Sequence, residues 1–276
     1  MPAVDSYFIT TPIYYVNDVP HLGHAYTTIA CDALARFMRL DGKKVLFLTG
    51  TDEHGQKVEK SAQAAGQSPA DFTNQVSQRF RDLTAKFEIS NDDFIRTTEQ
   101  RHIQAAQAIW TALVKSGDIY LGSYSGWYSV RDEAFFSEAE LTDGGAGERL
   151  APSGAPVEWV EEPSYFFRLS RWQKPLMKLY KENANFILPQ SRRNEVMSFV
   201  SGGLQDLSVS RTSFKWGVPV PEDEDHIMYV WLDALTNYLT ATGYPDLKSN
   251  VFETFWPTAL HVVGKDILRF HAVYWP

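Results

Sequence analysis

Two histidines one helical turn apart are the first residues of the sequence with an evident chemical use. His21 and His24 flank Gly23 at the start of a segment with helical periodicity. Both imidazoles would project from one side of the first turn, where free N–H groups and the helix dipole favour a polyphosphate. Gly23 would let a nucleotide approach the backbone closely. The pattern indicates stabilisation of charge on a phosphate during nucleotidyl transfer, where losing one donor typically slows the reaction about a hundred- to a thousandfold.

The histidine pair has two other interpretations. Such pairs also occur by chance on helix surfaces, where they only make surface hydrogen bonds. A metal site completed by His54 is the third interpretation, although no nearby carboxylate spacing matches a known zinc motif. The pair alone leaves all three open.

Further polar groups follow apolar runs that are typical of buried strands. Asp52 belongs to the segment 50–55 that follows the run 44–49, and Gly264, Lys265 and Asp266 follow a second such run. At the carboxyl edge of a parallel sheet, Asp52 could hold a substrate ammonium group, and Lys265 and Asp266 could contact phosphates and ribose hydroxyls. A capping aspartate and an ordinary turn are the simpler alternatives.

Two further clusters of residues are weaker indications of function. Trp231, Ala234 and Tyr238 are spaced one helical turn apart, which more often indicates core packing but would also suit a thioether. A basic group that includes Arg168, Arg171 and Lys174 could contact a phosphate backbone, or form a solvated helix face.

Composition limits the classes of protein. The chain has 276 residues, 44% of them hydrophobic, and a net charge of −8. The charge argues against a general nucleic-acid coat but not against an RNA enzyme with a local basic face. No apolar run is long enough to span a membrane. The single cysteine, Cys31, excludes an internal disulfide and a Cys-x-x-Cys zinc knuckle, and fits a reducing cytoplasm.

Strand and helix signals alternate along residues 1–117, which predicts an α/β fold with a doubly wound, Rossmann-like parallel sheet. Strands are predicted at 7–11 and 44–49, and helices at 22–40, 56–65 and 99–115. Another helix should begin at Ser68, a predicted N-cap. One face of the first helix is expected to carry Leu22, Tyr26, Ile29, Ala33, Phe37 and Leu40 toward the interior.

Residues 118–225 read as a connective α+β insertion with short aromatic strands and a surface loop at 143–156. The α/β pattern resumes at 226–276, with strands at 227–230 and 259–263 and a helix at 231–242. We therefore predict one parallel sheet that the insertion interrupts.

In this order the segments resemble the class I aminoacyl-tRNA synthetases, and the methionyl enzymes in particular. The resemblance rests on segment 11–17 leading into His21 and His24, on segments 50–55 and 229–234, and on Gly264 to Ile267 with Phe270 and His271. It covers the whole chain, so it is more specific than any single motif.

The resemblance implies activation of L-methionine by ATP, with Mg²⁺, and transfer to tRNA(Met), by a cytoplasmic monomer without a membrane segment. The implied catalytic residues are His21, His24 and Lys265. The implied ATP-binding residues are Tyr15, Asn17, His21, Gly23, His24, Gly264, Lys265 and Asp266. The implied methionine-binding residues are Ile13, Tyr14, Tyr15, Asp52, Trp231, Ala234, Leu235, Tyr238, Ile267 and His271. Arg168, Arg171 and Lys174 are the expected tRNA contacts.

The sequence departs from the family pattern in two places. The insertion has no cysteine, so we expect the zinc-free type with no bound metal. The Lys-Met-Ser-Lys-Ser signature and the anticodon-binding domain are expected beyond Pro276. Leucyl, isoleucyl and valyl enzymes are the nearest rivals, but they carry larger editing insertions. A small-molecule nucleotidyltransferase and a non-catalytic paralogue are the rivals from other classes.

We predict that residues 1–276 alone are catalytically impaired, because the second signature is missing. Methionine-dependent ATP–pyrophosphate exchange should be much slower than in a longer form of the protein. Equal exchange rates would contradict this prediction.

Overall fold

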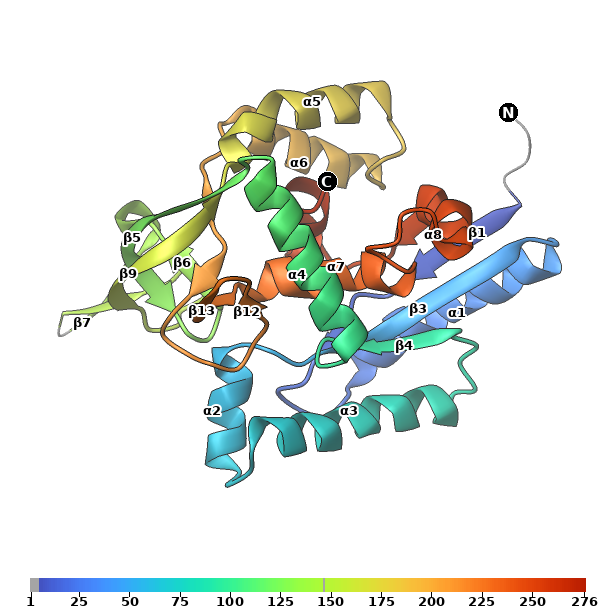
Figure 1. Cartoon of the computed structure of the whole chain (residues 1–276), viewed down its shortest axis with the longest axis horizontal. Coiled ribbons are helices and arrows are strands. Elements are labelled where there is room, and N and C mark those ends of the chain that lie inside the picture. Colours follow the sequence, from blue (N-terminus) through green and yellow to red (C-terminus); the bar gives the residue numbers. More distant parts are fainter. Residues whose placement is uncertain (1–4, 146) are drawn as a thin grey trace.

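The computed structural model describes residues 5–145 and 147–276. A parallel sheet lies on the right of Figure 1, where β1, β3 and β4 are labelled. Its strands lie in the order β14-β1-β3-β4, with β2 paired to the end of β3, and every pair is parallel. The strands are β1 (Ser6–Thr10), β2 (Tyr14–Tyr15), β3 (Lys44–Asp52), β4 (Asp93–Arg96) and β14 (Ala259–His261). The predicted α/β class is confirmed.

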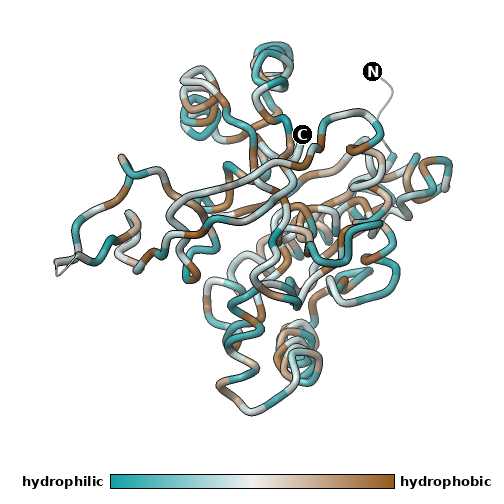
Figure 2. The backbone as a smooth tube through the Cα atoms, turned by 60° about the vertical axis from the view of Figure 1, so that its left-hand side comes forward, coloured by the Kyte–Doolittle hydropathy of each residue, from teal (hydrophilic) through white to brown (hydrophobic). Residues whose placement is uncertain are grey.

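Helices flank this sheet, and the early ones agree closely with the sequence signals. They are α1 (Leu22–Leu40), α2 (Gln56–Ala64), α3 (Pro69–Lys86), α4 (Gln100–Lys115), α7 (Val230–Ala241) and α8 (Asn250–Phe255). The Ser68 hydroxyl accepts a hydrogen bond from the Asp71 amide at 3.1 Å, so α3 begins with the predicted cap. In Figure 2 the helices carry both hydrophobic and hydrophilic stretches, as expected where only one side packs inward.

The prediction of which face of α1 packs inward is wrong, because all six residues expected on that face, from Leu22 to Leu40, are exposed. Leu22 and Leu40 are 88% and 89% exposed. The side that faces the sheet instead carries Cys31 and Ala35, which pack against Ile9 of β1 and Phe47 of β3. A helix that lies this close to two strands needs small side chains where the strands supply large ones.

The insertion forms its own antiparallel layers, at the left and top of Figure 1. One sheet has the order β10-β9-β5-β6, a second has β11-β13-β12, and β7 pairs β8. The strands are β5 (Ile119–Ser129), β6 (Ala134–Phe136), β7 (Thr142–Gly145), β8 (Glu148–Leu150), β9 (Glu158–Phe167), β10 (Leu207–Ser208), β11 (Ser210–Arg211), β12 (Pro219–Val220) and β13 (Asp223–Met228). Its helices are α5 (Gln173–Glu182) and α6 (Gln190–Ser201).

Single helical turns complete the described chain. They are η1 (Glu138–Glu140), η2 (Leu169–Trp172), η3 (Trp256–Thr258), η4 (Lys265–Ile267) and η5 (Phe270–Tyr274), of which η5 is a π-helical turn. None of the helices in the described ranges combines the length and the apolarity that crossing a bilayer requires.

Two predictions about the later chain are wrong. The expected loop at 143–156 contains the β7–β8 hairpin. The strand expected at 227–230 is the end of β13, which pairs antiparallel with β11 and β12 rather than joining the parallel sheet. Its first half is acidic and partly exposed, whereas a central parallel strand is buried on both faces. After the insertion only β14 returns to the parallel sheet.

We predict that Gly50→Ala lowers the free energy of unfolding by about 3 kcal/mol. A Cβ atom at Gly50 would lie 2.1 Å from the backbone oxygen of Ile95, so β3 and β4 would have to separate. Gly264→Ala is the matched control, because a Cβ atom there meets nothing within 4 Å. Urea unfolding would measure both, and equal midpoints would contradict the prediction.

Candidate active site

At the carboxyl edge of the parallel sheet, three strands lead into segments that carry predicted site residues. β1 and β14 are neighbours, and the Val262 amide extends their pairing by donating to the Thr10 carbonyl at 3.0 Å. The chain after β1 leads to β2 and α1, the chain after β3 carries Asp52, and the chain after β14 leads to Gly264. This edge is where doubly wound sheets bind ligands.

His21 and His24 form a reciprocal cap at the start of α1. The Gly23 amide donates to His21 Nδ1 at 3.0 Å, and the His21 amide donates to His24 Nδ1 at 3.1 Å. Because both Nδ1 atoms accept, each neutral ring carries its proton on Nε2. The two rings stack with centroids 3.8 Å apart. Neither Nε2 atom has a hydrogen-bond partner in the described residues, so two N–H donors remain available at the helix N-terminus.

Burial, followed by the neighbouring His21, lowers the pKa of His24 to about 4. His24 is therefore neutral at physiological pH. Gly23 makes the pairing possible, because a Cβ atom there would lie 2.9 Å from the His21 ring.

Asp52 ends β3 as a buried carboxylate that is not fully satisfied. It is 7% exposed, and its Oδ1 atom has no hydrogen-bond partner among the described residues. Burial raises the pKa of Asp52 well above its ordinary value, and the carboxylates of Asp233 and Glu133 raise it further. An unpaired buried oxygen in a negative environment is a site for a cationic group.

Tyr238 and His271 form a rigid aromatic wall near this edge. His271 Nδ1 lies 2.9 Å from the Ile267 carbonyl, which can only accept, so this nitrogen carries the proton. His271 Nε2 then accepts from the Tyr238 phenol at 2.7 Å. Burial lowers the pKa of His271 to about 4, which keeps this arrangement neutral.

Some of the other residues predicted to bind methionine pack against the same core cluster as Tyr238. The Trp231 ring stacks on Phe270 with centroids 3.6 Å apart. Ile13 and Trp231 pack against a core cluster that contains Leu235 and Tyr238. Ala234 is buried in α7, the helix that also carries Trp231 and Tyr238.

Two predicted residues lie less favourably for substrate contact. Tyr14 directs its hydroxyl toward α1, 2.7 Å from Thr28 Oγ1. Asn17 lies exposed in the loop before α1. Neither position tests the predicted role directly.

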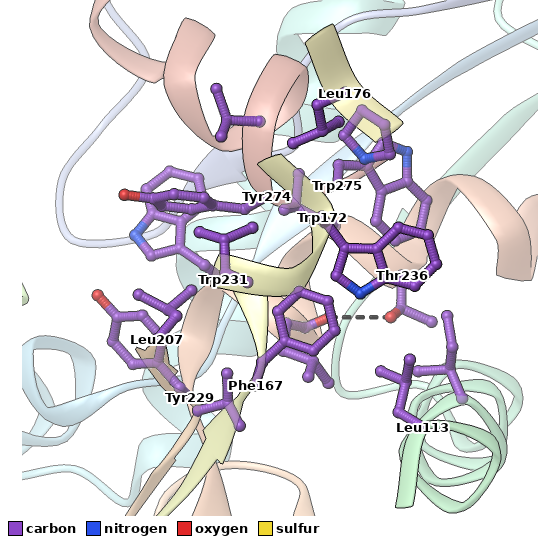
Figure 3. A pocket seen from close by; sticks show the side chains of 17 residues that line it. Leu113, Phe167, Trp172, Leu176, Leu207, Tyr229, Trp231, Thr236, Tyr274 and Trp275 are labelled. Atoms are coloured by element: carbon purple, nitrogen blue, oxygen red, sulfur yellow. Dashed lines mark hydrogen bonds between the residues drawn. The ribbon is translucent and has the colours of Figure 1, made fainter. Parts of the chain in front are cut away.

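An apolar cavity of about 290 Å³ lies behind Trp231 and Leu235, between α4, α7, η2 and the end of the described chain. Figure 3 shows the side chains of Trp231, Tyr274 and Trp275 around it. Lys265 and Asp266 instead line a wider cleft toward the insertion, of about 1060 Å³. His21, His24 and Asp52 line neither space, so convergence of all the predicted groups on one crevice stays a prediction.

Two of the three basic residues predicted to contact tRNA have structural partners. Arg168 Nε donates to the Gly117 carbonyl at 3.0 Å, and its guanidinium lies 4.1 Å from the Tyr120 ring centroid. Arg171 pairs with Asp118 at 3.1 Å. Lys174 is exposed on α5. Within the described ranges no group of three histidine, cysteine or acidic residues could hold a metal ion.

A family model described as "tRNA synthetases class I (M)" matches residues 7–276. The chain belongs to this family. It is 63% identical over 272 residues to the methionine–tRNA ligase of Rickettsia bellii, covering 99% of this chain and 52% of that protein. The corresponding ligase of Mesorhizobium japonicum is 60% identical over 272 residues, with the same coverage.

Solved structures of the family are also similar. Methionyl-tRNA synthetase of Mycobacterium tuberculosis bound by methionyl-adenylate superposes with a TM-score of 0.95 at 56% identity, over 98% of this chain and 54% of that chain. Its apo form gives 0.85 at 52% identity, over 99% and 52%. The chain thus spans about half the length of the relatives that it matches.

In this class I synthetase chain, sequence patterns missed a buried network around Asp233. His54 Nδ1 lies 2.6 Å from one carboxylate oxygen of Asp233, and His102 Nε2 lies 2.7 Å from the other. The three residues join the end of β3, α4 and α7. An aspartate inside the almost wholly buried helix α7 was the available signal. His54 is thereby engaged with Asp233 rather than with His21 and His24.

We predict that Asp233→Asn lowers the free energy of unfolding by about 3 kcal/mol at neutral pH, because two buried imidazoles lose their charged partner. Burial alone would raise the pKa of Asp233, but His54 and His102 outweigh it and lower the pKa to about 2. A lowered carboxyl pKa means that this stabilisation is present at neutral pH and is lost as pH falls from about 4 toward 2.

Urea unfolding of Asp233→Asn and of the exposed control Glu224→Gln, between pH 7 and 2.5, would measure this difference. If the difference in free energy of unfolding between the two variants did not become smaller at low pH, the prediction for Asp233 would be wrong.

Proposed function

We propose that the chain is the part of a methionine–tRNA ligase that binds methionine and ATP and forms methionyl-adenylate. The observation that carries the proposal is the unpaired, buried oxygen of Asp52 at the carboxyl end of β3, where Tyr15 is its neighbour in the sheet. The similarity to a methionyl-tRNA synthetase bound by methionyl-adenylate supports it. Transfer of the methionyl group to tRNA(Met) would be the activity of the whole protein.

The Asp52 carboxylate would hold the ammonium group of methionine. Its raised pKa reflects burial without a counter-ion, and a substrate ammonium group would supply one. Trp231, Tyr238 and His271 would surround the thioether, which packs favourably against aromatic rings. Tyr15 pairs with Asp52 across β2 and β3, so it would lie over the same substrate.

His21, His24 and Lys265 would act on ATP, which binds with Mg²⁺. A methionine carboxylate oxygen would form a bond to the α-phosphorus in line with the bond that breaks, and pyrophosphate would leave. The Nε2–H donors of His21 and His24 and the charge of Lys265 would stabilise the negative charge on the phosphates. Gly264 and Asp266 would contact the nucleotide. The protein would thus work mainly by positioning its substrates.

We further propose a zinc-free, monomeric, cytoplasmic enzyme. The only cysteine of the chain, Cys31, is buried between α1 and the sheet and not in the insertion. We propose Lys174 as the main tRNA contact of the three basic residues, because it is exposed. Arg168 and Arg171 are instead hydrogen-bonded to the chain around Gly117.

We predict opposite effects of Asp52→Asn on binding and stability. Methionine affinity should fall at least about a hundredfold, because a charged partner is lost. Thermal stability at neutral pH should rise, because a raised carboxyl pKa means that the ionised form costs folding free energy above the unfolded value. For the same reason, methionine affinity of the unsubstituted protein should fall as pH falls through that raised pKa.

Calorimetry with methionine, leucine and valine would test the binding, and a thermal melt the stability. Asp41→Asn, at the exposed end of α1, is the control and should change neither. Equal binding of the three amino acids would defeat the proposed function.

A further inference from the structure

Glu133 is a buried acidic residue that the proposed chemistry does not use. It lies in the turn between β5 and β6 of the insertion and is only 8% exposed. Its φ angle is +47°, a left-handed conformation that non-glycine residues seldom adopt. Such a conformation persists only where the surroundings hold the residue in place.

The surroundings of Glu133 belong mainly to the synthetase domain. Its Oε1 atom accepts a hydrogen bond from the Tyr15 phenol at 2.7 Å and another from the Lys57 amide at 3.1 Å. Its backbone carbonyl accepts a hydrogen bond from the Tyr229 phenol. One residue of the insertion therefore reaches three segments that are far away in the sequence.

The contact with Lys57 completes the start of α2. The N-cap of this helix is Gly55, which has no side chain to accept a hydrogen bond from the first turn. Glu133 supplies the missing acceptor, and its negative charge suits the positive end of the helix dipole. A Cβ atom at Gly55 would lie 2.9 Å from Glu133 Oε1 and 3.0 Å from the Tyr15 hydroxyl, so glycine makes room for the carboxylate.

The contact with Tyr15 fixes a residue next to Asp52. Tyr15 pairs with Asp52 in the parallel sheet, and the Lys57 ammonium group lies 5.5 Å from its ring centroid. A phenol that donates to a carboxylate forms a charge-assisted hydrogen bond, which is stronger than a neutral one. The ring of Tyr15 thus has one defined orientation at the site where methionine would bind.

The insertion side of this contact is also held firmly. The buried guanidinium of Arg211 lies 4.4 Å from the Tyr229 ring centroid and 4.6 Å from that of Phe135. Burial raises the pKa of Glu133, while the hydrogen bonds from Tyr15 and Lys57 and the positive charges of Lys57 and Arg211 oppose the rise. These groups compensate the buried carboxylate.

We propose that Glu133 is a positioning residue that couples the insertion to the methionine site. By orienting Tyr15 and capping α2, it sets the affinity for methionine without taking part in the chemical step. This inference rests on the proposed function, since it assigns a substrate to the Tyr15 side of the site.

The test compares Glu133→Ala with Asp132→Ala in the full-length protein. Asp132 is the neighbouring carboxylate in the same turn, but the hydrogen bonds it accepts come from Ser129, Ser153 and Arg131 of the insertion. Glu133→Ala should raise the KM for methionine about tenfold in ATP–pyrophosphate exchange, the loss expected for one buried hydrogen bond. The kcat should change less than about twofold. Asp132→Ala should leave the kcat and the KM for methionine unchanged.

Glu133→Gln and Tyr15→Phe separate positioning from general damage to the fold. Glutamine keeps an oxygen acceptor, so Glu133→Gln should restore most of the methionine affinity. In Tyr15→Phe the donor is already absent, so Glu133→Ala should have a clearly smaller effect there than in the unsubstituted protein. Fully additive effects, or a loss of kcat with an unchanged KM for methionine, would overturn the proposal.

Hydrogen exchange provides a readout that needs no substrate. Glu133→Ala should speed exchange of the Lys57 amide at least about tenfold without changing exchange in α3. Unchanged exchange at Lys57 would overturn the capping role. Normal methionine-dependent activity with an unchanged KM in Glu133→Ala would overturn only the positioning role. If the unsubstituted protein showed no methionine-dependent ATP–pyrophosphate exchange, the proposed function would be overturned, and with it the assignment of methionine as the substrate.

Discussion

Three carboxylates, Asp52, Glu133 and Asp233, are buried near one another where the parallel sheet ends, and the repulsion between them limits what this region can do. Burying a charge is unfavourable unless partners compensate it. Two imidazoles compensate Asp233, and a phenol and a backbone amide compensate Glu133. Asp52 keeps an oxygen without a partner. The protein therefore holds in a fixed place an acidic group with one unpaired oxygen, and a cationic substrate group there would stabilise its ionised form.

Three histidines of this region have a tautomer that their hydrogen bonds define. Backbone amides at the start of α1 occupy the Nδ1 atoms of His21 and His24, so their Nε2–H groups face outward. His271 has the opposite tautomer, because its Nδ1–H donates to the Ile267 carbonyl and its Nε2 accepts from the Tyr238 phenol. Burial keeps the pKa of His24 and His271 near 4, so the same donors and acceptors persist at neutral pH. Fixed donors need no reorganisation when charge develops on a substrate.

Features with a local cause could be predicted from the sequence. The bounds of α1 agree at both ends, and the Ser68 cap starts α3, because caps and periodicity depend on residues within one or two turns. The parallel sheet follows from strand and helix alternation, and the order of the motifs was sufficient to indicate the family. The inward face of α1 and the partner of β13 were predicted wrongly, because both depend on which distant strand lies alongside.

By itself, then, the sequence determined the class of fold, the family and the residue types available at the sheet edge. Tertiary structure alone decided which of these residues are paired and which are left unpaired. Tyr15 meets Glu133 across 118 residues, and His54 meets Asp233 across 179. Partners this distant have no spacing that a pattern could detect, because their contact depends on the packing of the whole chain. The unpaired oxygen of Asp52 becomes visible only once every neighbour has its own partner.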